Sequence, residues 1–232
     1  MTKAEIQASE EAARVTSEGF RFLLSYIEPG MTEIEVANAL REYFRSLGYR
    51  QWAFRFIIAT GKNAADPHHW PTGTRLKKGH GVVCDFGIRV RGMCADMTRV
   101  VFLGKPTARQ QRLYCLLLRA QRRVVQRIRP TFSAREADAL ARDFLAKHGF
   151  NNRIFRHGTG HGVGKRIHEP PWLSPTKKER SIQERDIITV EPGLYFTARD
   201  GYRIEDMYLI TPRGARQLTS APKDIKHVTI PV

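Results

Sequence analysis

The chain has 232 residues, of which 41% are hydrophobic and 27% are charged. These proportions are typical of a folded protein and exclude collagen-like and disordered chains. No apolar run approaches the roughly 18 residues that a membrane-spanning helix needs. The N-terminal segment lacks the apolar stretch of a secretory signal. We therefore expect a cytoplasmic protein without a membrane span.

The charge is strongly unbalanced, with 39 basic and 23 acidic residues and a net charge of +16. No acidic residue lies between Asp96 and Glu136. The spacing of apolar residues from Leu113 to Ile128 predicts an amphipathic helix over residues 109–128. Its opposite side carries an arginine face, made of Arg109, Arg112, Arg119, Arg122, Arg123 and Arg127. We favour a solvated helix face, and the alternative is a surface for nucleic acid or another anionic partner.

The three cysteines are Cys84, Cys94 and Cys115, and none of them forms a C-x-x-C pair. An odd number without that spacing argues against a disulfide framework and a structural zinc site. We expect all three to be buried free thiols.

The chain repeats itself once. Ile27 aligns with Ile128, an offset of 101 residues, and the same offset pairs Thr32–Glu35 with Ser133–Glu136. Both four-residue segments match the capping box that begins a helix. Each half then reads as a long helix, a turn with proline, a capped helix ending at glycine, and strands. This order predicts an α+β fold with pseudo-twofold halves at about 10–102 and 111–211, and a site between them.

Two aspartates of the first half lie in apolar strand-like segments, Asp85 in 81–87 and Asp96 in 93–98. A turn centred on Val90-Arg91 would place Asp85 directly opposite Asp96. Cross-strand neighbours lie about 4.5 to 5.5 Å apart. Two carboxylates at that distance repel each other unless a cation lies between them, so the pattern indicates a metal site.

The second half also places carboxylates at the ends of apolar segments, Glu191 after 187–190 and Glu205 after 202–204. Between these halves, His157 and His161 lie in a glycine-rich segment, and His168 follows shortly after it. Glycines let the backbone approach a ligand closely.

Four carboxylates and one imidazole form a hard, oxygen-rich set that suits manganese or a comparable divalent ion. The set comprises Asp85, Asp96, His161, Glu191 and Glu205. Two ions about 3.5 to 4 Å apart would lower the pKa of a bridging water, polarise a carbonyl and stabilise a tetrahedral intermediate. The chemistry that this site predicts is hydrolysis.

With these motifs, from Pro29–Glu33 to Ile204–Asp206, the chain resembles the pita-bread metallopeptidases, which include methionine aminopeptidases, Xaa-Pro aminopeptidases and prolidases. The resemblance implies a pita-bread fold with a central curved antiparallel sheet flanked by helices. It also implies a single catalytic domain over residues 1–232, without the separate N-terminal domain that Xaa-Pro peptidases usually carry. We therefore expect small peptide substrates, and a homodimer is a further expectation.

The resemblance also implies roles for individual residues. Asp85 is similar to a ligand of one metal, and His161 and Glu191 to ligands of the other. Asp96 and Glu205 resemble bridging carboxylates. The expected ions are manganese, with cobalt, iron or zinc as alternatives. The residues expected on the substrate side are His68, His157, His168 and Arg203, and Glu191 is similar to a residue proposed to shuttle a proton.

Within the family, the segments around His157, Glu191 and Arg203 are most similar to those of the Xaa-Pro peptidases. The implied activity is cleavage of the bond between an N-terminal residue and proline by a hydroxide that bridges the metals. One alternative is a methionine aminopeptidase. The other is a non-catalytic member of the fold that binds nucleic acid, ribosomes or another anionic partner.

Overall fold

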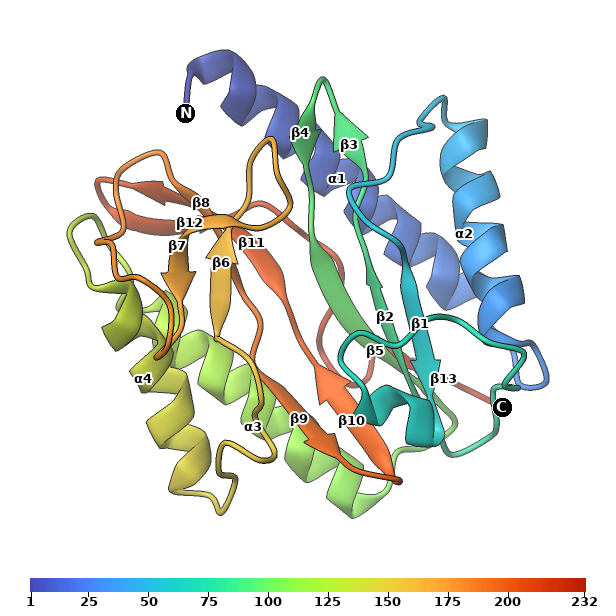
Figure 1. Ribbon diagram of the computed structural model, residues 1–232. Helices are drawn as coiled ribbons and strands as arrows, with labels where there is room; N and C mark the ends of the chain where they lie inside the picture. The colour runs from blue at the N-terminus through green and yellow to red at the C-terminus, as the bar shows by residue number, and fades with distance from the viewer.

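A computed structural model describes residues 1–232, and it contains two similar halves (Figure 1). In the first half, helices α1 (Lys3–Tyr26) and α2 (Glu33–Ser46) pack beside a four-stranded sheet. In the second, α3 (Ala108–Val125) and α4 (Ala134–Ala146) accompany a five-stranded sheet. The predicted α+β repeat is therefore confirmed.

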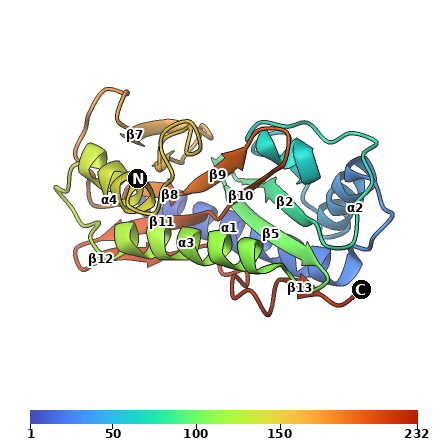
Figure 2. The same cartoon turned by 90° about the horizontal axis from the view of Figure 1, so that it is seen from below.

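The four-stranded sheet has the order β1 (Ile57–Thr60), β2 (Gly81–Phe86), β5 (Met97–Leu103) and β13 (Thr229–Ile230). The five-stranded sheet has the order β12 (Gly214–Gln217), β11 (Asp206–Thr211), β8 (Ile187–Val190), β6 (Gly160–Gly162) and β7 (Glu169–Leu173). Two hairpins complete the strands, β3 (Arg89–Val90) with β4 (Met93–Cys94) and β9 (Gly193–Phe196) with β10 (Asp200–Arg203). A 3-10 helix, η1 (Gly61–Ala65), follows β1. Figure 2 shows the long helices α1 and α3 on the same side of the strands, which leaves the other side for the site.

The capped helices begin where the sequence predicts, with one difference. Thr32 and Glu35 form the complete capping box of α2. Ser133 caps α4 by accepting from the backbone of Glu136, but the side chain of Glu136 does not return the bond. The Ser133 hydroxyl instead donates to Glu179. The predicted second capping box is therefore only half formed.

The predicted register of the first hairpin is wrong by two residues. Asp85 lies opposite Thr98, and Val90 lies opposite Met93. The turn is centred on Arg91 and Gly92, which adopt φ angles of 45° and 81°. Glycine tolerates this left-handed region, so the turn forms one residue later than Val90-Arg91. A shift of two residues keeps each side chain on its face of the sheet, so Asp85 and Asp96 still share a face as diagonal neighbours.

Helix α3 buries the predicted apolar side, including Leu113, Tyr114 and Leu117. The arginine face is exposed except at Arg109, which pairs with Asp200 and lies 4.5 Å from the centre of the Phe196 ring. Arg109 therefore joins two elements and does not belong to the solvated face. No helix is long and apolar enough to cross a membrane.

The expectation of three buried thiols fails at one position. Cys84 and Cys94 are buried, whereas Cys115 is exposed. Cys115 lies on the outer side of α3, between the exposed residues Arg112 and Arg119.

Candidate active site

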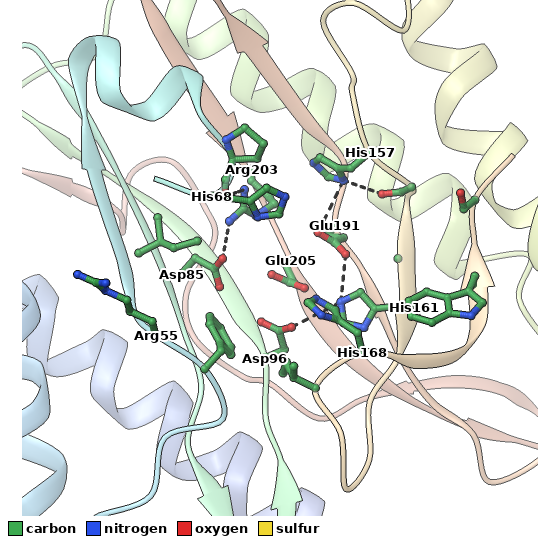
Figure 3. Close-up of a pocket in the computed structure, with 18 of the residues that line it drawn as sticks. Arg55, His68, Asp85, Asp96, His157, His161, His168, Glu191, Arg203 and Glu205 are labelled. Atoms are coloured by element: carbon green, nitrogen blue, oxygen red, sulfur yellow. Dashed lines mark hydrogen bonds and ion pairs between the residues drawn. The ribbon is translucent and has the colours of Figure 1, made fainter. Parts of the chain in front are cut away.

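A cavity of about 400 Å³ opens between the two halves. All nine site residues that the sequence predicts line it, and Figure 3 shows them converging from both sides: His68, Asp85, Asp96, His157, His161, His168, Glu191, Arg203 and Glu205. The first half contributes Asp85 from β2 and Asp96 from the position directly before β5. The second half contributes His161 from β6, and it places Glu191 and Glu205 directly after β8 and β10.

The carboxylates and the imidazole form overlapping groups whose ligand atoms lie within 4.8 Å of one another. One group is Asp85, Asp96 and Glu205, and another is His161, Glu191 and Glu205. Glu205 belongs to both, which is the arrangement that a bridging carboxylate requires. Asp96 also groups with His161, and His168 joins that third cluster.

The donor set fits two divalent cations. Asp85 Oδ1 is buried without any hydrogen-bond partner, and a buried oxygen without a partner is costly. Burial, followed by the charges of the neighbouring carboxylates, raises the pKa values of Asp96 and Glu205 well above their ordinary range. Burial also raises the pKa of Glu191 to about 8. Cations between these groups would relieve both the missing contact and the mutual repulsion.

His161 is held in the form that binds a metal. Its Nδ1 lies 3.0 Å from the carbonyl oxygen of Gly162, so Nδ1–H donates there. Nε2 then faces Glu191 Oε1 at 3.3 Å and Asp96 Oδ2 at 3.6 Å. Burial, and then the nearby His168, lowers the pKa of His161 to about 3. The ring is therefore neutral, with its lone pair directed into the carboxylate cluster.

The glycines around His161 are required by close packing. A Cβ at Gly160 would lie 2.1 Å from the carbonyl oxygen of Thr189, and one at Gly162 would lie 2.4 Å from that of Pro170. Only glycine lets β6 run this close to the neighbouring backbone.

Arg203 is only 3% exposed, and the protein itself occupies its donors. Its Nη2 donates to Asp85 Oδ2, its Nε to Thr98 Oγ1 at 2.9 Å, and its Nη1 to the Tyr195 hydroxyl at 2.7 Å. Sequence analysis expects Arg203 to bind substrate. The geometry adds a positioning role, because these contacts orient Asp85 while the arginine still borders the cavity.

The histidines of the cavity differ in whether their ring nitrogens are hydrogen-bonded within the protein. His157 Nδ1 lies 2.7 Å from the Gly158 carbonyl oxygen and its Nε2 lies 2.8 Å from the Tyr195 hydroxyl, so both nitrogens are occupied. Burial lowers the pKa of His157 to about 3. The rings of His68 and His168 make no hydrogen bond within the protein and belong to exposed residues. These two histidines are therefore free to contact a substrate.

A buried carboxylate anchors the loop that carries His68. The side chain of Glu33 is fully buried and accepts from Thr60, Asn63, His69 and Thr72. These contacts hold residues 60–72 against the first turn of α2 and fix where His68 enters the cavity.

Sequence analysis missed Thr98 and Tyr195. Thr98 Oγ1 donates to Glu205 Oε2 at 2.6 Å, and Tyr195 joins Arg203 to His157. Thr98 has a signal in the sequence, because it follows Asp96 by two positions and shares its strand face. Tyr195 has none, since an aromatic residue in an apolar strand usually indicates core packing.

Comparison with known proteins places the chain in a family. Residues 7–212 match metallopeptidase family M24. The chain belongs to this family. It is 38% identical over 221 residues to an uncharacterized peptidase of Bacillus subtilis, YqhT, covering 95% of this chain and 62% of that protein. It is 35% identical over 224 residues to the Xaa-Pro dipeptidase of Pyrococcus furiosus, covering 97% of this chain and 64% of the relative.

The M24 chain also superimposes on solved structures. The Xaa-Pro dipeptidase from Bacillus anthracis matches with a TM-score of 0.92 and 37% identity, over 98% of this chain and 63% of that one. The fold is therefore the pita-bread fold that the sequence predicts. The chain spans less than two thirds of the length of these relatives.

Proposed function

We propose that this chain catalyses the hydrolysis of the bond between an N-terminal residue and proline, with two divalent ions held between its halves. The observation that carries the proposal is the pair of ligand groups that share Glu205 beside the unpartnered oxygen of Asp85. The names of two relatives support the substrate class, since both are Xaa-Pro dipeptidases. Membership of a metallopeptidase family supports the requirement for metal.

Asp85 would hold one ion, and His161 and Glu191 the other, with Asp96 and Glu205 shared between them. Hard oxygen donors with one imidazole favour manganese, and cobalt, iron or zinc are the alternatives. When bound, such ions polarise a peptide carbonyl and make water nucleophilic at neutral pH.

The protein's own groups orient the reactants and handle the proton. Glu191 Oε1 faces His161, whereas Oε2 lies 3.8 Å from His157 Nδ1 and is the atom suited to accept a proton. The Tyr195 hydroxyl accepts from Arg203 and donates to His157, which keeps His157 in one tautomer.

The substrate would enter from the side of His68 and His168, whose rings are free. A proline nitrogen has no N–H and its ring fixes the backbone, so the residue before proline presents a tertiary amide. In this arrangement the free N-terminal amine lies near the carboxylates, and His68 and His168 donate to the peptide beyond the scissile bond. Arg203 acts by positioning Asp85.

A panel of matched peptides tests the proposal. The manganese-loaded protein should release alanine from Ala-Pro and from short peptides that begin with Ala-Pro, and it should leave Met-Ala-Ser intact. Release of methionine with Ala-Pro left intact would assign the chain to the methionine aminopeptidases. Cleavage of neither peptide would favour a binding protein, for which the exposed arginines of α3 offer a surface.

A further inference from the structure

The two sides of the candidate metal site are joined by few main-chain contacts. Asp85 and Asp96 belong to the sheet that contains β5, whereas His161, Glu191 and Glu205 belong to the segments around β11. No strand ladder pairs β5 with β11. We call the boundary between β5 and residues 205–206 the seam. One main-chain hydrogen bond crosses it beside the site, from Glu205 N to Thr98 O at 3.0 Å.

A fully buried arginine crosses this seam. Arg99 lies on β5 with 0% exposure, and its guanidinium donates to five acceptors. Nη1 donates to the carbonyl oxygens of Thr98 and Glu205, and Nη2 donates to Asp206 Oδ1. The remaining bonds run to the carbonyl oxygens of Ala221 and Pro222. Arg99 therefore holds the main chain on both sides of the site.

Asp206, the partner of Arg99, accepts hydrogen bonds from three further side chains. It is also fully buried, and besides Arg99 it accepts from Thr219, Gln121 and Lys223. The amide of Gln121 also donates to the carbonyl oxygen of Val190 at 3.0 Å, directly before Glu191. The contacts of Asp206 thus reach the main chain beside two of the expected ligands, Glu191 and Glu205.

This connectivity matters because a pair of ions needs a fixed spacing. Two metals in such sites lie about 3.5 to 4 Å apart, and here their ligands come from opposite sides of the seam. The first ion can be held largely from one side. The second ion has ligands from both sides, so it binds only if Asp96 and Glu205 keep a fixed position relative to each other across the seam.

We propose that the buried Arg99–Asp206 pair positions the two sides of the site and decides whether the second ion binds. The inference rests on the proposed two-metal function. Neither side chain lines the cavity, so both are positioning residues. Outer-shell partners of this kind change metal affinity by about 10- to 100-fold when they are replaced.

The test is manganese binding to Asp206→Asn, measured by calorimetry together with electron paramagnetic resonance. The wild-type chain should bind two ions and give the spectrum of an exchange-coupled pair. Asp206→Asn should keep the tighter ion, weaken the second by about 10- to 100-fold, and give the spectrum of an isolated ion.

Glu33→Gln is the matched control, because Glu33 is an equally buried carboxylate with five hydrogen bonds but lies away from the seam. It should lose stability and keep both ions. Lys223→Met removes a cation from Asp206 Oδ2 but leaves the bond between Arg99 and Asp206 Oδ1 in place, and it should also keep both ions.

Breaking a buried ion pair costs about 3 to 5 kcal/mol, so Asp206→Asn can fail to fold. In that case, manganese binding to Arg99→Lys tests the positioning role. It retains the charge, but an ammonium has three donors where a guanidinium has five, so one lysine cannot replace the five hydrogen bonds of Arg99. We expect loss of the second ion there too.

The outcomes separate the two proposals. Two coupled ions in Asp206→Asn or Arg99→Lys, with unchanged affinities, would overturn the positioning role. Equal loss of the second ion in Glu33→Gln would also overturn it, by showing that general destabilisation suffices. Fewer than two ions in the wild-type chain would instead contradict the proposed two-metal function.

Discussion

Removing the metals should make the stability of this protein fall as the pH rises above 6.5. The ordinary pKa of Glu191 is 4.5, and burial raises it to about 8 in the folded, metal-free protein. Between these values the folded chain holds a proton that the unfolded chain has released. The free energy of unfolding therefore decreases with increasing pH. Asp96 and Glu205 act in the same direction, because their pKa values are also raised.

The size of the effect follows from the difference in the number of protons bound by the folded and the unfolded chain. One proton changes the free energy of unfolding by about 1.36 kcal/mol per pH unit. Glu191 alone thus contributes a loss of about 2 kcal/mol between pH 6.5 and pH 8. Its side chain is only 15% exposed, so solvent screens little of this effect. Below pH 6.5 the trend becomes weaker, because the unfolded chain protonates His157 and His161 while burial keeps both neutral in the fold.

Urea unfolding of the metal-free protein at a series of pH values measures this dependence, and we expect stability to fall from pH 6.5 to pH 8. Glu191→Gln should reduce the slope above pH 6.5 by about 1.36 kcal/mol per unit. With manganese bound, the ligands are ionised and stability should no longer fall. A metal-free protein whose stability stays constant or rises from pH 6.5 to 8 would refute the reasoning.

Three further predictions concern single groups. Asp96→Asn should abolish both hydrolysis and the binding of the second ion, which metal analysis and peptide assays would reveal; full activity would remove the two-metal site from consideration. His168→Ala should reduce turnover by about 10² to 10⁴ at normal metal content, and loss of metal would show instead that His168 is a ligand. Replacing the exposed arginines of α3 by glutamine should leave peptide cleavage unchanged. If that face binds nucleic acid, binding should weaken steeply with salt, and no retention in a gel shift at physiological salt would support the solvated face.

The five expected ligands could be predicted from the sequence because of their surroundings. Each carboxylate lies within or at the end of an apolar segment, where an unpaired charge is costly. The prediction for Asp85 and Asp96 survives an error of two in the hairpin register, because side chains alternate with a period of two.

The contacts that orient those ligands could not be predicted. Thr98 and Glu205 are 107 residues apart in the sequence, and Arg99 and Asp206 are equally distant. No local pattern marks such pairs. The contacts of Arg203 could not be predicted for the same reason, since its partners Asp85 and Thr98 lie 118 and 105 residues away. A buried arginine with distant partners is indistinguishable in sequence from one that binds substrate.

The most direct test of the central claim is the rate of Ala-Pro hydrolysis, measured against the number of manganese ions bound per chain. Asp96 and Glu205 are expected to serve both ions, so we predict that full activity appears only when the second ion binds. Full activity with one ion bound, or without metal, would contradict the account.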